Sequence, residues 1–90
     1  MYSLSPTPVE VSKALAEKHR ILRKQLKMSQ TEMAERSGVS LGSLKRFENT
    51  GKISLNSLLK LIHLLGRLNE FENILLPKEN LDEIKKLFTE

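Results

Sequence analysis

The fold of this chain is decided by residues 29–48, which read SQTEMAERSGVSLGSLKRFE. Ser29 is followed three positions later by Glu32, the spacing of a capping box, in which each side chain accepts the backbone N–H of the other residue at the start of a helix. Gly38 ends this helix, because glycine adopts the left-handed conformation of a helix C-terminus without strain. Ser40 then caps a second helix. The stretch therefore predicts two short helices joined by a tight turn.

The second of these helices separates apolar from basic side chains. At about 100° per residue, Leu44 and Phe47 share one side of the helix with Glu48. The opposite side and its flanks carry Gly42, Lys45, Arg46, Asn49, Leu41 and Ser43. An arginine can form two hydrogen bonds with a guanine edge, and a lysine can reach a base or a phosphate. The pattern indicates a helix that lies in the major groove of DNA; the alternative is a helix face that only contacts solvent.

Capping residues and apolar spacing predict further helices on both sides of this stretch. Thr7 and Pro8 open a helix that runs to about Lys27. The apolar positions of this first helix are Val11, Leu15, Leu22 and Leu26, with Ala14 and Ile21 beside them. Later helices are expected over residues 55–65, 68–75 and 81–88. Because no segment alternates like a β-strand, the sequence predicts an all-α protein.

Charge is distributed unevenly along the chain. Residues 1–52 hold ten Lys and Arg against five Asp and Glu, whereas residues 53–90 hold five against six. The basic half contains the helix pair, which favours nucleic acid as a partner. Ninety residues supply one small core, and no apolar run is long enough to span a membrane. With no cysteine and no secretion signal, we expect a cytoplasmic protein.

Histidines and glycines form no pattern typical of an enzyme. His19 and His63 lie on separate expected helices, without a cysteine or a paired carboxylate nearby, so we expect partly buried packing residues rather than metal ligands. Gly51-Lys52 lacks the upstream glycine and the following Ser or Thr of a phosphate-binding loop. We therefore expect no catalysis, no cofactor and no metal.

Residues 15–66 resemble the lambda-repressor-like class of bacterial and phage regulators, also called the xenobiotic-response-element (XRE) family. The residues that carry the resemblance are Ser29-Gln30 at the start of the second helix, Ala34, Gly38 at the turn, Leu44, Phe47, and Glu48 followed by Gly51-Lys52. The resemblance implies a five-helix lambda-repressor-like DNA-binding domain in residues 8–76. An N-terminal arm in residues 1–7 and a short C-terminal helical extension in residues 77–90 would flank it.

The resemblance also implies a role for particular side chains. Base-edge contacts are expected from Leu41, Gly42, Ser43, Lys45 and Arg46. Phosphate contacts are expected from Gln30, Asn49 and Lys52, with Gln30 at the positive end of its helix. Arg23 and Glu48 match a salt bridge that braces the first helix against the third.

Some positions depart from the pattern of the family. Gly42 supplies no side chain in the middle of the reading face, and Leu41 offers only an apolar contact. Thr50 is expected to lengthen the loop before Gly51-Lys52. The basic residues Arg20, Lys24 and Lys27 on the first helix either contact phosphates or form a solvated face.

The C-terminal residues supply more apolar surface than a five-helix domain needs. The expected dimer surface comprises Leu68, Phe71, Leu75, Leu81, Ile84, Leu87 and Phe88. Helix-turn-helix proteins commonly bind two half-sites as two-fold dimers, which requires such a surface. The alternative is that this segment folds back and covers the core.

The expected function is that of a sequence-specific DNA-binding transcriptional regulator, a repressor that binds double-stranded DNA as a homodimer and often controls its own promoter. Residues 47–55 resemble regulators that accompany a Hip-type kinase toxin, so an antitoxin with a kinase-like toxin partner is the sharper version. The alternative is a protein-interaction module that uses the same fold and its apolar C-terminal surface, with DNA binding secondary. Without a second domain for a small molecule, a protein partner is the expected regulator.

Overall fold

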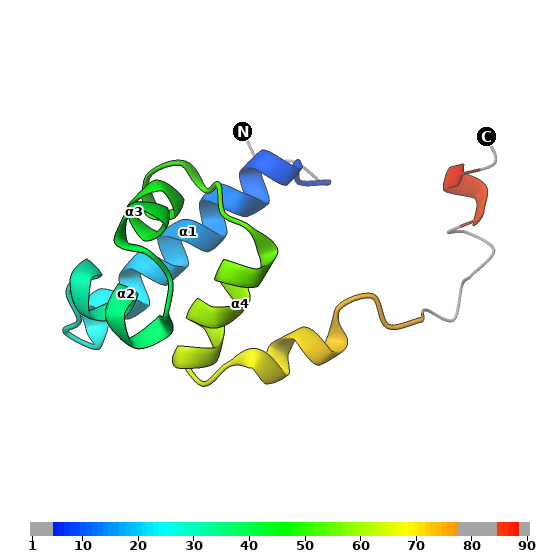
Figure 1. Cartoon of the computed structure of the whole chain (residues 1–90). Helices are drawn as coiled ribbons and strands as arrows, with labels where there is room; N and C mark the ends of the chain where they lie inside the picture. Colours follow the sequence, from blue (N-terminus) through cyan, green and yellow to red (C-terminus); the bar gives the residue numbers. More distant parts are fainter. Residues whose placement is uncertain (1–4, 78–84, 89–90) are drawn as a thin grey trace.

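The computed structural model describes residues 5–77 and 85–88 of the chain. Its elements are α1 (Pro8–Gln25), α2 (Gln30–Ser37), α3 (Leu41–Thr50), α4 (Leu55–Leu64) and the 3₁₀ helix η1 (Leu68–Asn73). Residues 85–88 are also helical. No strand occurs in these two ranges, and the expected all-α, lambda-repressor-like class is confirmed (Figure 1).

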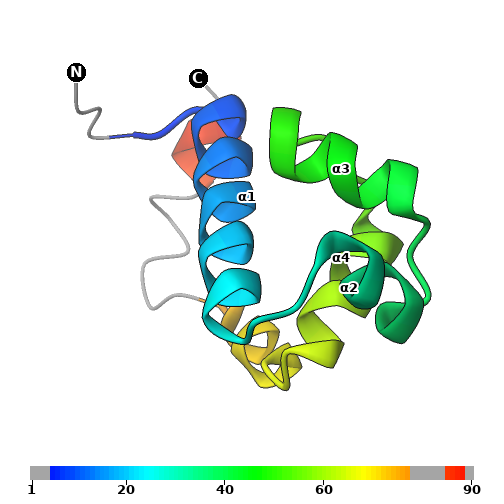
Figure 2. The ribbon, with the colours of Figure 1, turned by 90° about the vertical axis from the view of Figure 1, so that its left-hand side faces the viewer.

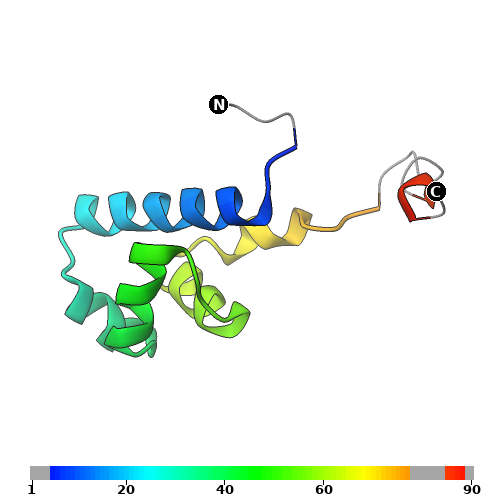
Figure 3. The same cartoon turned by 90° about the horizontal axis from the view of Figure 1, so that it is seen from above.

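The helices α2, α3 and α4 lie on one side of the long helix α1. Two views at right angles to that of Figure 1 agree on this arrangement (Figures 2 and 3). Helix α3 packs against both α1 and α2, α2 also packs against α4, and η1 follows α4 and contacts it. The buried apolar residues of the core are Ala16, Met33, Ala34, Val39, Leu44, Phe47 and Leu61. Every one of the four α-helices therefore contributes to a single core.

Local signals set most of the helix ends. Ser29 and Glu32 form the expected capping box, each side chain accepting the backbone N–H of the other. Gly38 ends α2 with φ of 80°, a backbone conformation that glycine adopts without strain. Gly51 ends α3 with φ of 82°, and a Cβ atom there would lie 3.0 Å from the carbonyl carbon of Ser12 in α1. Glycine at position 51 thus allows both the turn and the close approach of α1.

Helix α3 is longer than the sequence analysis expected. Thr50, which we placed in the following loop, forms the last residue of α3. Its hydroxyl donates to the carbonyl oxygen of Arg46 at 2.7 Å and accepts the backbone N–H of Lys52 at 3.1 Å. The side chain therefore closes the helix end where the sequence indicated a longer loop.

The buried face of α1 is not the one that its apolar residues suggest. Val11, Ile21 and Leu26 are exposed, and Leu15 and Leu22 are only half-buried. The residues that α1 buries are Ala16, His19 and Arg23. Their spacing of three and four positions places them on one face. Two of the three are polar, and they can be buried because they form the hydrogen-bond network described below.

The expected helix over residues 68–75 is shorter and of a different type. Its first six residues, Leu68–Asn73, form the 3₁₀ helix η1, and Ile74 is extended. The residue before it, Arg67, provides no side-chain cap, and uncapped connecting segments commonly form short 3₁₀ turns. The division of the chain at residue 77 stays a prediction.

Candidate nucleic-acid interface

The outer face of α3 carries free basic side chains. Leu44 and Phe47 are almost completely buried on the inner face of the helix, while Lys45, Arg46 and Asn49 are exposed. Within residues 5–77 and 85–88, the side chain of neither Lys45 nor Arg46 takes part in an ion pair or a hydrogen bond. Both cations are therefore available to an external anion or base.

The remaining residues of the expected reading face differ in what they can offer. Leu41 is half-buried and packs against the core, so only part of its side chain is accessible. Ser43 is exposed, and its hydroxyl accepts a hydrogen bond from the hydroxyl of Ser40 at 2.8 Å. A Cβ atom built at Gly42 would meet nothing within 4 Å. Gly42 thus lies on an open surface, and the fold does not require a glycine there.

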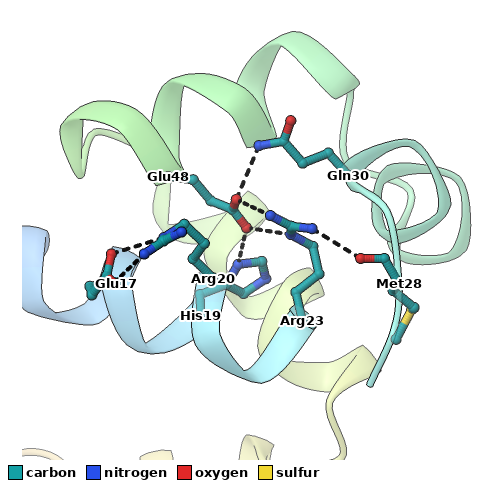
Figure 4. Close-up of polar contacts among 7 residues, drawn as sticks. All are labelled: Glu17, His19, Arg20, Arg23, Met28, Gln30 and Glu48. Atoms are coloured by element: carbon teal, nitrogen blue, oxygen red, sulfur yellow. Dashed lines mark hydrogen bonds and ion pairs between the residues drawn. The ribbon is translucent and has the colours of Figure 1, made fainter. Parts of the chain in front are cut away.

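Glu48 is buried at the centre of a polar network that joins three helices (Figure 4). Its Oε2 accepts from Arg23 Nε at 2.9 Å and is bonded to His19 Nδ1 at 2.8 Å. Its Oε1 accepts from Arg23 Nη2 at 2.8 Å and from Gln30 Nε2 at 3.0 Å. Arg23 Nη1 also donates to the backbone carbonyl of Met28, at 2.9 Å. The network fixes α1, α2 and α3 relative to one another. It contains the ion pair of Arg23 with Glu48 that the family resemblance implied.

Hydrogen bonding keeps Glu48 ionised in spite of its burial. Only 3% of its side chain is exposed, and desolvation of this kind favours the protonated form. The hydrogen bonds from Arg23, Gln30 and His19 outweigh that effect and hold the pKa of Glu48 below its usual value. Glu48 is therefore a buried anion with four hydrogen bonds, which link α1, α2 and α3.

The sequence analysis missed two members of the network, His19 and Gln30, the second of which it assigned to a phosphate. Burial of His19 lowers the pKa of the imidazole below the usual value, although the hydrogen bond to Glu48 acts in the opposite direction. The ring is therefore neutral at pH 7, with the proton on Nδ1 donated to the Glu48 carboxylate. Its position four residues before Arg23 was the available signal, because residues at i and i+4 share a helix face. His63, which we also expected to be partly buried, is exposed.

A shallow basic hollow lies between α1 and α3. It is lined by Arg20, Arg23, Lys24, Gln30, Lys45, Glu48 and Asn49. Three residues that the sequence analysis assigned to DNA, Gln30, Lys45 and Asn49, are thus brought together with the cations of α1. Gln30 also uses its amide N–H to brace Glu48, and Arg20 forms an exposed ion pair with Glu17 at 2.6 Å.

A second hollow lies on the other side of α3, next to the start of α4. It is lined by Ser43, Arg46, Lys52, Ile53, Ser54 and Ser57. Two cations and three hydroxyl groups therefore converge here, and the serines of α4 were not among the expected site residues. The structure groups Lys52 with Arg46, whereas Lys45 lies in the hollow on the α1 side.

The expected dimer residues that lie within the described ranges differ in exposure. Leu68 is 36% exposed, Phe71 is half-buried, and Leu75 is 95% exposed. Leu87 and Phe88 are also exposed. Leu81 and Ile84 lie outside the described residues.

In the described part of the chain, no group of three or more His, Cys, Asp or Glu side chains is placed to hold a metal ion. Likewise, none of the helices in residues 5–77 and 85–88 has both the length and the apolar character needed to cross a membrane.

Comparison with known proteins identifies the family. A family model described as helix-turn-helix matches residues 20–71, more than half of the chain, and this match includes α2, α3 and α4. Neither the curated proteins nor the solved structures yielded a match. The protein belongs to the XRE-type helix-turn-helix family of DNA-binding transcription regulators.

Proposed function

We propose that this protein is a transcriptional repressor that binds its operator as a homodimer and places α3 in the major groove. The observation that carries the proposal is the position of the free cations Lys45 and Arg46. They lie on the exposed face of α3, and each lines a different one of the two basic hollows.

The two hollows match the surroundings of a helix in the major groove. A recognition helix in that groove has a phosphate backbone on each side. On one side, we assign Arg20, Lys24 and Gln30 to one strand, because they line the hollow between α1 and α3. On the other, we assign Lys52 and the serines at the start of α4 to the second strand, because they line the second hollow, with support from the positive end of that helix. Phosphate contacts of this kind position the protein on the duplex.

Base reading is then assigned to few side chains. Arg46 is proposed to bind a guanine edge through two hydrogen bonds, with Lys45 and Ser43 reaching neighbouring bases. Gly42 contributes no side chain, and the accessible part of Leu41 offers one apolar contact to a thymine methyl group. Asn49 is assigned to a phosphate, since it lines the α1-side hollow.

This sparse reading face is the reason for proposing a dimer. One module with two long basic readers distinguishes few base pairs, whereas two modules on a palindromic site double the number. The exposed apolar residues around Leu75 supply a candidate contact between two copies. Autoregulation, and the antitoxin role with a kinase-like toxin, stay predictions that rest on the sequence of residues 47–55.

Selection of binding sites from a random DNA library tests the proposal. Wild-type protein should enrich a two-fold symmetric site, and the affinity should fall steeply with salt because phosphate contacts release counterions. Arg46→Ala should lose the base preference at one position of each half-site. The control variant Lys18→Ala should keep the base preference of the wild type.

That control removes the same charge from a residue of α1 that lines neither hollow. If the wild-type protein binds no sequence even at low salt, the repressor proposal fails and a protein-interaction module becomes the better explanation. If a single half-site is enriched and the protein is monomeric at the concentrations used, the proposed dimer fails.

A further inference from the structure

A cavity of about 280 Å³ is lined by residues that border neither of the two basic hollows. It is bounded by α1, α4 and η1, and one residue of α3, Phe47, forms part of its wall. Most of the lining is apolar, contributed by residues such as Leu15, Leu58 and Ile62. This volume is close to the lower end of the range of pockets that hold small organic molecules, about 300–1,000 Å³.

The cavity wall includes a buried polar group without a partner. His19 is 2% exposed, and its ring lines the cavity and meets the ring of Phe47 edge-on at 5.6 Å between centroids. Its Nδ1 is bonded to Glu48, but its Nε2 has no hydrogen-bond partner in the described structure. Buried polar groups of native proteins nearly always have a partner, so an orphaned one requires an explanation.

The partner of Nε2 must be a hydrogen-bond donor. Glu48 is ionised and accepts only, so the proton of the neutral ring lies on Nδ1. Nε2 then carries a lone pair next to a cavity whose lining is mainly apolar, with the charged residues Lys18, Arg67 and Glu70 as the exceptions. A hydroxyl or N–H group on an otherwise apolar molecule would satisfy it, whereas an anion or an ether oxygen would not.

We propose that this cavity is a binding site for a small, mainly apolar molecule that donates one hydrogen bond to His19 Nε2. A single aromatic or short aliphatic skeleton with one hydroxyl or N–H group has the required size and chemistry. This inference does not depend on DNA binding, and it differs from the sequence-based expectation of a protein partner as the regulator. Because Phe47 belongs to α3, the bound molecule would contact the same helix that carries Lys45 and Arg46.

Indole and benzofuran form a matched pair of probes for the full-length chain. They have nearly the same shape, but benzofuran places an oxygen lone pair where indole has its N–H. Calorimetry or NMR titration should show indole binding with a dissociation constant below about 1 mM, the range open to a ligand of this size. Benzofuran should bind about 5- to 10-fold more weakly, the factor expected for one hydrogen bond.

The ¹⁵N resonance of His19 Nε2 provides a direct readout. Indole should move it upfield, as a hydrogen bond to the lone pair requires, and benzofuran should not. Equal affinity for the two probes, or an unchanged Nε2 resonance at saturation with indole, would overturn the assignment of His19 as the anchor.

A pair of variants of α4 tests the location of the site. Ile62→Trp places a large side chain in the cavity and should abolish indole binding while leaving the His19–Glu48 network intact. Leu55→Trp adds the same side chain to an exposed position of α4 and should bind indole like the wild type. Unchanged binding by Ile62→Trp, with its fold verified by amide NMR spectra, or no binding of indole by the wild-type chain, would refute the proposal.

Discussion

Replacing Glu48 by Gln tests the central claim about the polar network. The amide has nearly the same shape as the carboxylate but no charge, and it keeps one acceptor oxygen in place of two. Glu48 accepts two hydrogen bonds at each oxygen. In the variant, one pair of donors would face an NH₂ group instead of an oxygen. His19 can change its tautomer in response, but Arg23 cannot lose its proton.

The cost follows from leaving the guanidinium of Arg23 buried without an anion. Only 8% of this side chain is exposed, and breaking a buried pair by removing one partner costs about 3–5 kcal/mol. Because Gln keeps two of the four hydrogen bonds, we expect the lower end, a loss of about 3 kcal/mol in the free energy of unfolding. For a domain of this size that lowers the melting temperature by about 12–24 °C.

Thermal and urea denaturation of Glu48→Gln and of Glu17→Gln measure this effect. Glu17 also pairs with an arginine, Arg20, but in an exposed position, so its variant should melt like the wild type. Site selection below the melting temperature should give Glu48→Gln the operator preference of the wild type. One kcal/mol corresponds to about 4–8 °C in melting temperature for a domain of this size. If Glu48→Gln melts within about 3 °C of Glu17→Gln, the charge of Glu48 contributes no net stability.

The same network predicts how stability depends on pH. The pKa of Glu48 and that of His19 are both lowered by folding, so each group gives stability that is present above its unfolded pKa and is lost as the pH falls. The loss from His19 should begin below about pH 6.5, and that from Glu48 below about pH 4.5, the usual values of these groups. Urea denaturation from pH 8 to pH 4 should show both losses of stability in the wild type and only the loss from His19 in Glu48→Gln. A wild-type stability that does not change between pH 7 and pH 4 would contradict the lowered pKa of both groups.

Three further predictions concern the surface. Arg46→Ala should relax specificity at one base pair by about 1–3 kcal/mol, whereas Lys52→Ala should weaken binding to all sequences and reduce the slope of log affinity against log salt by about one. Quantitative gel shifts on the selected site measure both effects. Equal losses of affinity on every sequence for Arg46→Ala would contradict its base-reading role. Gly42→Ala should raise the stability of the domain by about 0.5–1 kcal/mol, because the added Cβ meets no atom and alanine favours helix; a lower melting temperature would show that α3 needs the glycine. Leu75→Asp should convert the proposed dimer to a monomer in sedimentation experiments without lowering its helix content, and an unchanged sedimentation coefficient would exclude this residue from the dimer contact.

Signals within three or four residues of each other determined the helix ends. The capping box of Ser29 and Glu32, and the turn glycine Gly38, form their hydrogen bonds and backbone conformations locally, so the sequence alone places the two helices of the motif. The exposed positions of Lys45 and Arg46 were equally predictable, because a short helix with two strongly apolar residues on one side leaves its other side outward.

Contacts between distant segments were decided only by the tertiary structure. The apolar residues of α1 indicated one buried face, but the helix buries His19 and Arg23, because Glu48 of α3 forms hydrogen bonds with both. Glu48 lies more than twenty residues later in the sequence, and only the family resemblance implied its pairing with Arg23. The two basic hollows and the cavity beside His19 likewise exist only where α1, α3 and α4 meet. Local hydrogen bonds are closed within one helical turn and can be read from spacing, whereas burial of a charge depends on a partner that only the packing of the helices brings within reach.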